Sequence, residues 1–227
     1  AWNYEKGEAT YVSGLMGISN PSYQVVSADG SRVYSVGEDD GLTSTAHVLS
    51  FDKANGKLTL LNTQLTQGGA PCYINITPDG KSVVTANYMG ANISLIPLEA
   101  SGRLTENVKT IAFTGEGEIK NRQDQPHLHC VEFTPDGKHL LANDLGTDKI
   151  HIFPLNSDGK LDEKAGFDVN LEPASGPRHL CFSNDGRFAY LINEISGKVT
   201  TLSYDGKGLT PIQYIESDTV NAQGSAD

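Results

Sequence analysis

The sequence of 227 residues predicts an all-β fold, a β-propeller built from four-stranded blades. Asp-Gly pairs recur at 29–30, 79–80, 136–137 and 185–186, at intervals of 50, 57 and 49 residues. Each pair separates two short apolar runs, and two further runs follow before the next unit begins. No stretch combines a helical hydrophobic period with capping residues. Four strands per repeat favour a propeller over a solenoid, whose repeats are usually shorter.

The four strands of each unit can be justified in order. The first follows a proline and ends at the Asp-Gly turn, as in "PCYINITPDG" and "PRHLCFSNDG". The second and third are the apolar runs represented by "KSVVTANY" and "NISLIPL". A glycine-containing turn such as "SGRL" then precedes the fourth run, "ENVKTIAF". Tight turns between such runs are typical of antiparallel hairpins, so each unit is predicted to be a meander.

The complete units span residues 21–66, 70–115, 126–170 and 177–217. We interpret residues 1–20 as the tail of an earlier unit, with "ATYVSGL" as its last strand, and residues 218–227 as a loop toward a further unit. The sequence therefore predicts a single propeller domain over residues 1–227 that is incomplete at both ends. An open arc of this kind would expose strand edges and apolar blade faces.

Composition excludes several classes of function. The net charge of -11 argues against nucleic-acid binding, which needs a basic surface. No apolar stretch approaches the roughly 18 residues of a membrane span. The first residues lack the basic start and apolar run of a signal peptide, so a cytoplasmic location is expected.

The chain has three cysteines, Cys72, Cys130 and Cys181, and none belongs to a C-x-x-C pair. An odd number in this arrangement favours neither a disulfide framework nor a zinc site, and it suits a reducing compartment. All three fall in first-strand segments, where we expect small buried side chains; a reactive nucleophile is the alternative.

Spacing from the turn glycines predicts which residues meet at one end of the axial channel, because a blade's first strand lies nearest the axis. Eight residues before these glycines stand Ser22, Cys72, His129 and Arg178. Seven and eight residues after them stand Gly37-Glu38, Asn87-Tyr88, Asp144-Leu145 and Asn193-Glu194. We therefore expect His129, Arg178 and Glu194 to converge there, with Asp144 nearby. A base, a cation and an acid in one place suit acid/base chemistry on an anion.

The segment "QPHLHC" adds a second histidine. His127 and His129 are two residues apart, so strand alternation places them on one side of a regular strand. The preceding loop "TGEGEIKNRQDQ" is the longest connection between units, and we expect it to cover this end of the channel. The chain has no tight group of metal-ligating residues beyond His-x-His, so no metal is expected.

Each of these residues also has a purely structural interpretation. A histidine at a strand start is usually a hydrogen-bonded structural residue, and a lone glutamate such as Glu194 is usually solvated. Arg178 could pair with a neighbouring acid, and Asp144 could cap loop amides. Co-location of three complementary groups favours a functional site over these separate explanations. His47, His139 and His151 occupy other strand positions and are assigned no role.

Three segments carry a resemblance to a known family: "GGAPCYINITPDGKSVVTANYMG", "QPHLHCVEFTPDGKHLLANDLGTDKIHIF" and "GPRHLCFSNDGRFAYLINEISGKV". They resemble the seven-bladed propeller lactonases, which include bacterial propeller-type 6-phosphogluconolactonases and fungal carboxymuconate-lactonising enzymes. The resemblance covers nearly all of the chain and implies a ring of seven blades. By motif, the catalytic histidine, arginine and glutamate of the muconate branch fall on His129, Arg178 and Glu194. The family's next unit contributes an arginine proposed to join the site, and this chain ends before it.

The resemblance implies lactone hydrolysis without a cofactor, with a small anionic sugar lactone, 6-phosphogluconolactone, as the favoured substrate. Glu194 or His129 would accept a proton from the attacking water, and Arg178 would hold the phosphate or the oxyanion. His127 and Asp144 would contact the substrate. Two alternatives stay open: reversible lactonisation of a muconate by the same residues, and a propeller that only binds a partner.

Overall fold

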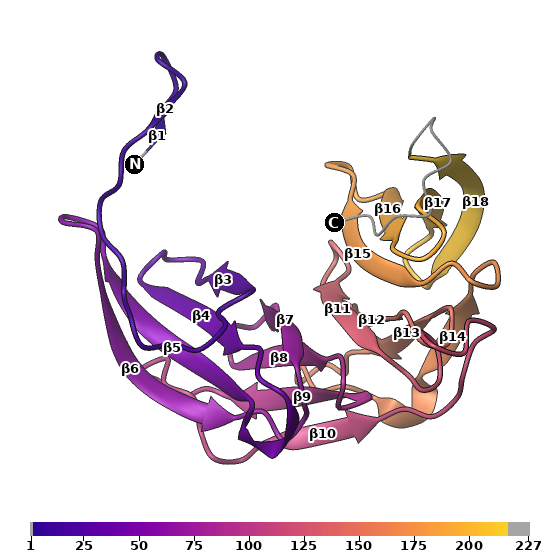
Figure 1. The fold of residues 1–227 in the computed structure, drawn as a ribbon, viewed down its shortest axis with the longest axis horizontal. Coiled ribbons are helices and arrows are strands. Elements are labelled where there is room, and N and C mark those ends of the chain that lie inside the picture. The colour runs from indigo at the N-terminus through magenta and orange to yellow at the C-terminus, as the bar shows by residue number, and fades with distance from the viewer. Residues whose placement is uncertain (1, 218–227) are drawn as a thin grey trace.

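The computed structural model describes residues 2–217 and shows four four-stranded antiparallel sheets. Consecutive strands are neighbours in every sheet, and the sheets follow one another around an open arc (Figure 1). Blade 1 contains β3 (Gln24–Val26), β4 (Arg32–Gly37), β5 (Thr45–Asp52) and β6 (Lys57–Leu65). Blade 2 contains β7 (Pro71–Ile76), β8 (Ser82–Asn87), β9 (Asn92–Pro97) and β10 (Lys109–Ala112).

Blade 3 contains β11 (Leu128–Phe133), β12 (His139–Asp144), β13 (Lys149–Pro154) and β14 (Phe167–Asn170). Blade 4 contains β15 (Pro177–Phe182), β16 (Phe188–Asn193), β17 (Lys198–Tyr204) and β18 (Leu209–Glu216). Two short 3₁₀ turns, Gly41–Thr43 and Glu163–Ala165, are the helical elements among the described residues. The predicted all-β fold and its four units are confirmed. Within residues 2–217, no helix is long and apolar enough to cross a membrane.

The region before blade 1 differs from the prediction. A small hairpin of β1 (Trp2–Asn3) and β2 (Glu8–Ala9) lies there, and it extends away from the blades (Figure 1). The strand expected over residues 9–15 does not form, since only Ala9 belongs to a strand. A strand needs a neighbouring backbone to bond with, and residues 11–15 have no ladder partner among the described residues. The loop predicted over residues 218–227 lies outside the described residues.

The repeated Asp-Gly pair closes the first hairpin of each blade in the same way, as blade 3 shows. Gly137 has a φ of 68°, a conformation that glycine adopts without steric cost, and its N–H donates to the Thr134 carbonyl at 2.8 Å. The Asp136 carboxylate accepts from the Thr134 hydroxyl at 2.7 Å. A turn of such specific geometry sets the register of the two strands that it joins.

The hydrophobic core lies between consecutive blades. Ile74 and Ile96 are fully buried in the layer between blades 1 and 2. In blade 3, the adjacent β12 residues Leu140 and Leu141 belong to two different layers, one toward blade 2 and one toward blade 4. Each such side chain contributes about 1.5–3 kcal/mol when buried. Packing on both faces of blade 3 therefore fixes the blades relative to one another.

The cysteine prediction is confirmed for two residues and wrong for the third. Cys72 and Cys130 are buried free thiols, whereas Cys181 is exposed. Cys181 in β15 pairs with Tyr190 in β16, whose side chain is 42% exposed. The next residue along, Leu180, faces blade 3 and is buried, so alternation turns Cys181 to the opposite face. No described blade covers that face.

Candidate active site

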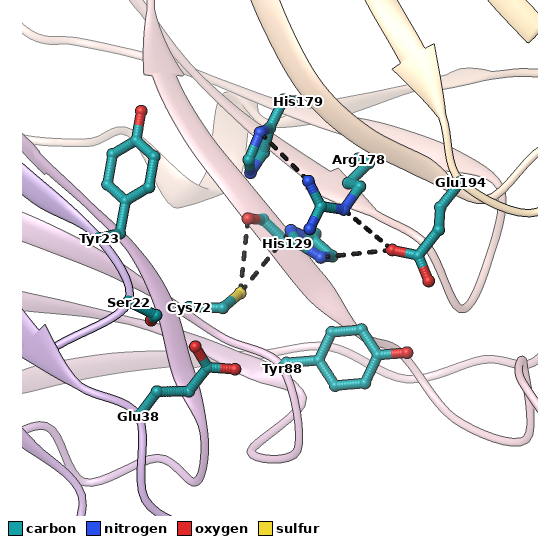
Figure 2. A pocket seen from close by; sticks show the side chains of 9 residues that line it. All are labelled: Ser22, Tyr23, Glu38, Cys72, Tyr88, His129, Arg178, His179 and Glu194. Atoms are coloured by element: carbon teal, nitrogen blue, oxygen red, sulfur yellow. Dashed lines mark hydrogen bonds and ion pairs between the residues drawn. The ribbon is translucent and has the colours of Figure 1, made fainter. Parts of the chain in front are cut away.

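A pocket of about 260 Å³ lies where the first strands of the blades begin and the second strands end (Figure 2). We call this end of the arc the top face. The lining residues come from all four blades: Ser22, Tyr23, Glu38, Cys72, Tyr88, His129, Arg178, His179 and Glu194. They stand seven or eight residues before a turn glycine, or eight after it. Because this spacing is the same in each blade, equivalent positions of the four blades line one cavity.

Local irregularities in the inner strands aim the site residues into this pocket. The pairing of β11 with β12 shifts between Leu128 and Cys130, which leaves His129 outside the regular ladder. The equivalent shift in β7 falls at Cys72, and the one in β15 spans Arg178 and His179. A bulge re-aims a side chain while the strand continues. Blades 2, 3 and 4 therefore present the pocket residues of their first strands through the same backbone irregularity.

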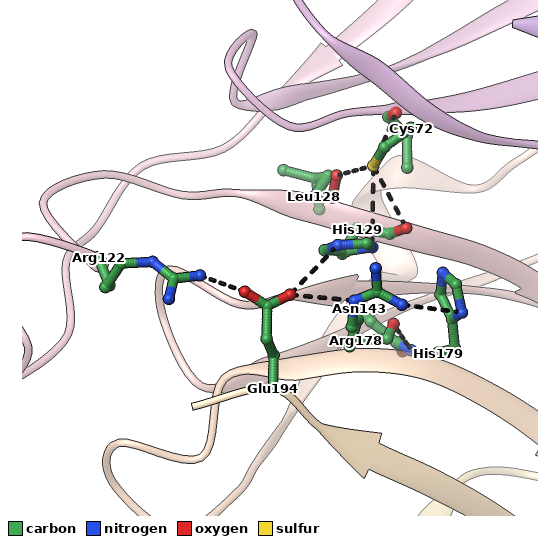
Figure 3. Close-up of polar contacts among 9 residues, drawn as sticks. Cys72, Arg122, Leu128, His129, Asn143, Arg178, His179 and Glu194 are labelled. Carbon is green, nitrogen blue, oxygen red and sulfur yellow. Dashed lines mark hydrogen bonds and ion pairs between the residues drawn. The ribbon is translucent and has the colours of Figure 1, made fainter. Parts of the chain in front are cut away.

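Glu194 is the centre of the polar contacts in the pocket (Figure 3). Its Oε2 accepts a hydrogen bond from Arg178 Nε at 3.0 Å and lies 3.5 Å from His129 Nε2. Its Oε1 is bonded to the Arg122 guanidinium. The Glu194 side chain is only 11% exposed. One buried carboxylate thus holds two arginines and a histidine from separate segments of the chain.

These contacts determine the ionisation of Glu194. The hydrogen bond from His129, followed by that from Arg122, lowers the pKa of Glu194 to about 2. A carboxylate with that pKa is ionised at neutral pH and is a weak proton acceptor. Its oxygens are also occupied by three cationic or N–H groups. The geometry therefore suits Glu194 to orient His129 and Arg178 rather than to take a proton itself.

His129 lies between Glu194 and Cys72. Its Nδ1 is 3.8 Å from Cys72 Sγ, and its ring meets the Tyr88 ring edge-on at 5.6 Å between centroids. The arrangement resembles a cysteine–histidine pair, but burial raises the pKa of the Cys72 thiol well above its usual value. The thiol also has the Leu128 carbonyl at 3.5 Å as an acceptor. Cys72 therefore stays protonated, whereas nucleophilic catalysis requires the thiolate.

Sequence reasoning assigned no role to four residues in or beside the pocket that carry polar or ionisable groups. Arg122 comes from the loop over residues 114–125, so this loop does reach the site, as expected. His179 has its Nδ1 3.5 Å from Arg178 Nη1. Tyr88 and Glu38 occupy the same position after their turn glycines as Glu194. Spacing alone identified these last two positions, and only their side-chain directions were unknown.

Two residues that we expected to bind substrate do not line the pocket. Asp144 is fully buried, and its carboxylate accepts bonds from His127 N at 2.7 Å, Gly146 N at 2.9 Å and Thr147 Oγ1 at 2.6 Å. It stands seven residues after its turn glycine, and alternation directs that position into the blade. Asp144 therefore caps loop amides, which was the structural interpretation.

His127 lies behind the pocket wall. Its ring stacks on Tyr88 at 4.3 Å between centroids, and its Nδ1 is 2.9 Å from the Tyr88 carbonyl oxygen. It precedes β11, so it does not share the side of a regular strand with His129. His127 supports Tyr88, which does line the cavity. Within residues 2–217, no group of three or more His, Cys, Asp or Glu residues is arranged to hold a metal ion.

Comparison with known proteins adds to this geometry. The family described as Lactonase, 7-bladed beta-propeller, matches residues 1–227. The chain belongs to this lactonase family. The family match covers all four blades and the pocket that they form.

Individual relatives agree with this membership. The 6-phosphogluconolactonase of Bacillus subtilis is 34% identical over 215 residues, which cover 92% of this chain and 60% of the relative. A crystal structure of a candidate 6-phosphogluconolactonase from Bacteroides fragilis superposes with a TM-score of 0.92 at 47% identity, over 100% of this chain and 65% of that one. The structure of the Pseudomonas aeruginosa periplasmic gluconolactonase superposes with a TM-score of 0.88 at 30% identity. The superposition covers 99% of this chain and 65% of that one. The lactonase chain described here thus spans slightly less than two thirds of these relatives.

Proposed function

We propose that the protein carrying this chain is a lactone hydrolase that converts 6-phosphogluconolactone to 6-phosphogluconate. The observation that carries the proposal is the contact of Glu194 with both His129 and Arg178 in a pocket built from four blades. Membership of the lactonase family and the names of the relatives support the same reaction. We also propose that the four blades belong to a larger ring, as the family description of seven blades suggests.

In this proposal His129 is the general base. With its Nε2–H directed at Glu194, Nδ1 carries the lone pair that accepts a proton from water. The resulting hydroxide attacks the lactone carbonyl carbon, and the negative charge develops on the carbonyl oxygen. The bond from that carbon to the ring oxygen then breaks. The imidazolium returns its proton to the ring oxygen, so one water is added and the base is regenerated.

The arginines supply the anion binding. Arg178 lines the pocket with an 18% exposed side chain, and its guanidinium suits the oxyanion of the tetrahedral intermediate. Arg122 is 40% exposed at the rim, where it would attract the substrate phosphate. Two arginines against Glu194 leave an excess of positive charge on that side of the pocket. This local excess offsets the net charge of -11 on the chain.

The test is hydrolysis of 6-phosphogluconolactone above its spontaneous rate by the complete gene product. Glu194→Gln and His129→Gln should each lower kcat by about 100-fold or more, the range of acid–base catalysis. Glu172→Gln is the matched control, because this exposed carboxylate of the same region pairs with Lys198 outside the pocket. Equal rates with and without protein would instead favour a propeller that only binds a partner.

We further propose a cytoplasmic location. The described cysteines are all free, which suits a reducing compartment. One relative is described as periplasmic, so the two compartments need to be distinguished directly. Cell fractionation with immunodetection of the complete protein tests this proposal, and recovery in the periplasmic fraction would refute it.

A further inference from the structure

A second carboxylate, Glu38, faces the pocket from the side opposite Glu194 (Figure 2). It follows β4 of blade 1, at the position that Glu194 occupies after β16 of blade 4. Its backbone is held on both sides, because Glu38 N donates to the Asn20 carbonyl at 2.9 Å and Asn20 Nδ2 donates to the Glu38 carbonyl at 2.6 Å. The position of this carboxylate is thus a property of the fold.

Unlike Glu194, Glu38 has no side-chain partner in the part of the chain that the structure describes. Among residues 2–217, no hydrogen bond or ion pair reaches its half-buried carboxylate, whereas both oxygens of Glu194 are occupied. A partly buried charged group without a partner is costly, and in a pocket this cost is recovered when a ligand supplies the missing donors. Glu38 is therefore the acceptor that the pocket leaves open for a ligand.

The neighbours of Glu38 define which donors would fit. Ser22 lines the same side of the pocket and presents a hydroxyl group, whereas Tyr23 contributes its ring, which stacks on Tyr73 at 3.9 Å, and directs its hydroxyl away from Glu38 (Figure 2). The two arginines lie on the other side, around Glu194. The pocket thus has an anion-binding half and a half with the Glu38 carboxylate and the Ser22 hydroxyl. A ligand with one anionic end and several hydroxyl groups complements both halves.

We propose that Glu38 is a specificity-determining residue that accepts hydrogen bonds from the hydroxyl groups of the lactone and repels a second carboxylate on the substrate. This inference rests on the proposed lactonase function and deepens it. Polyhydroxylated sugar lactones would be favoured, because a carboxylate forms strong charge-assisted bonds with sugar hydroxyls. Muconate-type dianions would be disfavoured, since their second carboxylate would face Glu38 rather than an arginine.

The experiment compares wild type, Glu38→Gln and Asp40→Asn in the complete gene product. Asp40 is the matched control, because it is an exposed carboxylate two residues away that makes no side-chain capping bond. The readout is the ratio of kcat/KM for glucono-δ-lactone to kcat/KM for δ-valerolactone, which lacks the hydroxyls. The ratio should fall about tenfold or more in Glu38→Gln, the effect of losing a hydrogen bond to a charged group, and stay constant in Asp40→Asn. Inhibition by cis,cis-muconate should strengthen about tenfold in Glu38→Gln.

Other outcomes would overturn the inference. An equal fall in kcat/KM for both lactones would indicate that Glu38 acts in the chemical step and does not recognise the hydroxyl groups of the substrate. An unchanged ratio would remove Glu38 from specificity altogether. If wild type hydrolyses no lactone, the proposed function fails, and calorimetry with gluconate then decides the role of Glu38 separately. In that case wild type should bind gluconate at least about tenfold more tightly than Glu38→Gln, and equal affinities would refute the inference.

Discussion

Arg178 Nε donates a hydrogen bond to Glu194 Oε2 across 3.0 Å, which joins the start of β15 to the residue that follows β16. Because both residues belong to one hairpin, the pairing of two adjacent strands is enough to bring them together. His129 approaches the same oxygen from the neighbouring blade, at 3.5 Å. The reactive arrangement therefore depends on hairpin register for one contact and on packing between blades for the other.

Arg122 should contribute to kcat/KM but contribute little to the free energy of unfolding. Arg122→Gln removes a cation bonded to Glu194, so kcat/KM for a phosphorylated lactone should fall about tenfold. The side chain is 40% exposed, and we expect the free energy of unfolding to change by less than about 1 kcal/mol. Lys120→Gln is the control on the same loop, because Lys120 pairs with Glu116 and does not line the pocket. Equal losses in both variants would point to a general charge effect.

Glu194 should make stability depend on pH in the acid range. Hydrogen bonds from His129 and Arg122 lower its folded pKa to about 2, from an ordinary value of 4.5. Its contribution is therefore present above pH 4.5 and is lost as pH falls toward 2. Urea unfolding of wild type and Glu194→Gln at several pH values checks this, since the other titrating groups are common to both proteins. The difference between them should shrink over that window, and a constant difference would contradict the assignment.

The cysteines should differ sharply in reactivity. Burial raises the pKa of the Cys72 thiol, so iodoacetamide should leave Cys72 unlabelled, whereas in this 227-residue chain it should label Cys181, which lies on the face that no described blade covers. Mass spectrometry of the labelled peptides measures this directly, and Cys181→Ser should abolish the labelling. Cys72→Ala should keep activity within about tenfold, because the proposed mechanism has no covalent thiol step. An acyl adduct on Cys72 would overturn that mechanism.

Asp144 should be important for stability. Asp144→Ala leaves the buried N–H of His127 and the loop amide of Gly146 without their acceptor, and we expect a loss of about 3–5 kcal/mol in the free energy of unfolding. Asp158→Ala is the exposed control, where the pair with Lys160 should be worth less than about 1 kcal/mol. Urea denaturation measures both variants. A loss below about 1 kcal/mol for Asp144→Ala would contradict its capping role.

The blade repeat and three pocket positions follow from the sequence. Each Asp-Gly turn sets the register of its hairpin locally, so counting from Gly137 and Gly186 correctly places His129, Arg178 and Glu194 around one cavity. Strand alternation, applied to the same count, would also have separated Asp144 from the pocket. These features were predictable because they depend on residues close together in the chain.

Other features were decided only by the packing of one blade against another. Arg122 reaches Glu194 across 72 residues of sequence, along a loop without a periodic pattern that could predict its path. Cys181 is exposed because no described blade covers its face of blade 4, although its own strand resembles those of the buried cysteines. Glu38 and Glu194 occupy equivalent positions, yet one is bound by two arginines and the other has no partner among the described residues. The local sequence determines the backbone position of such a side chain, and the packing of neighbouring blades determines which groups it contacts.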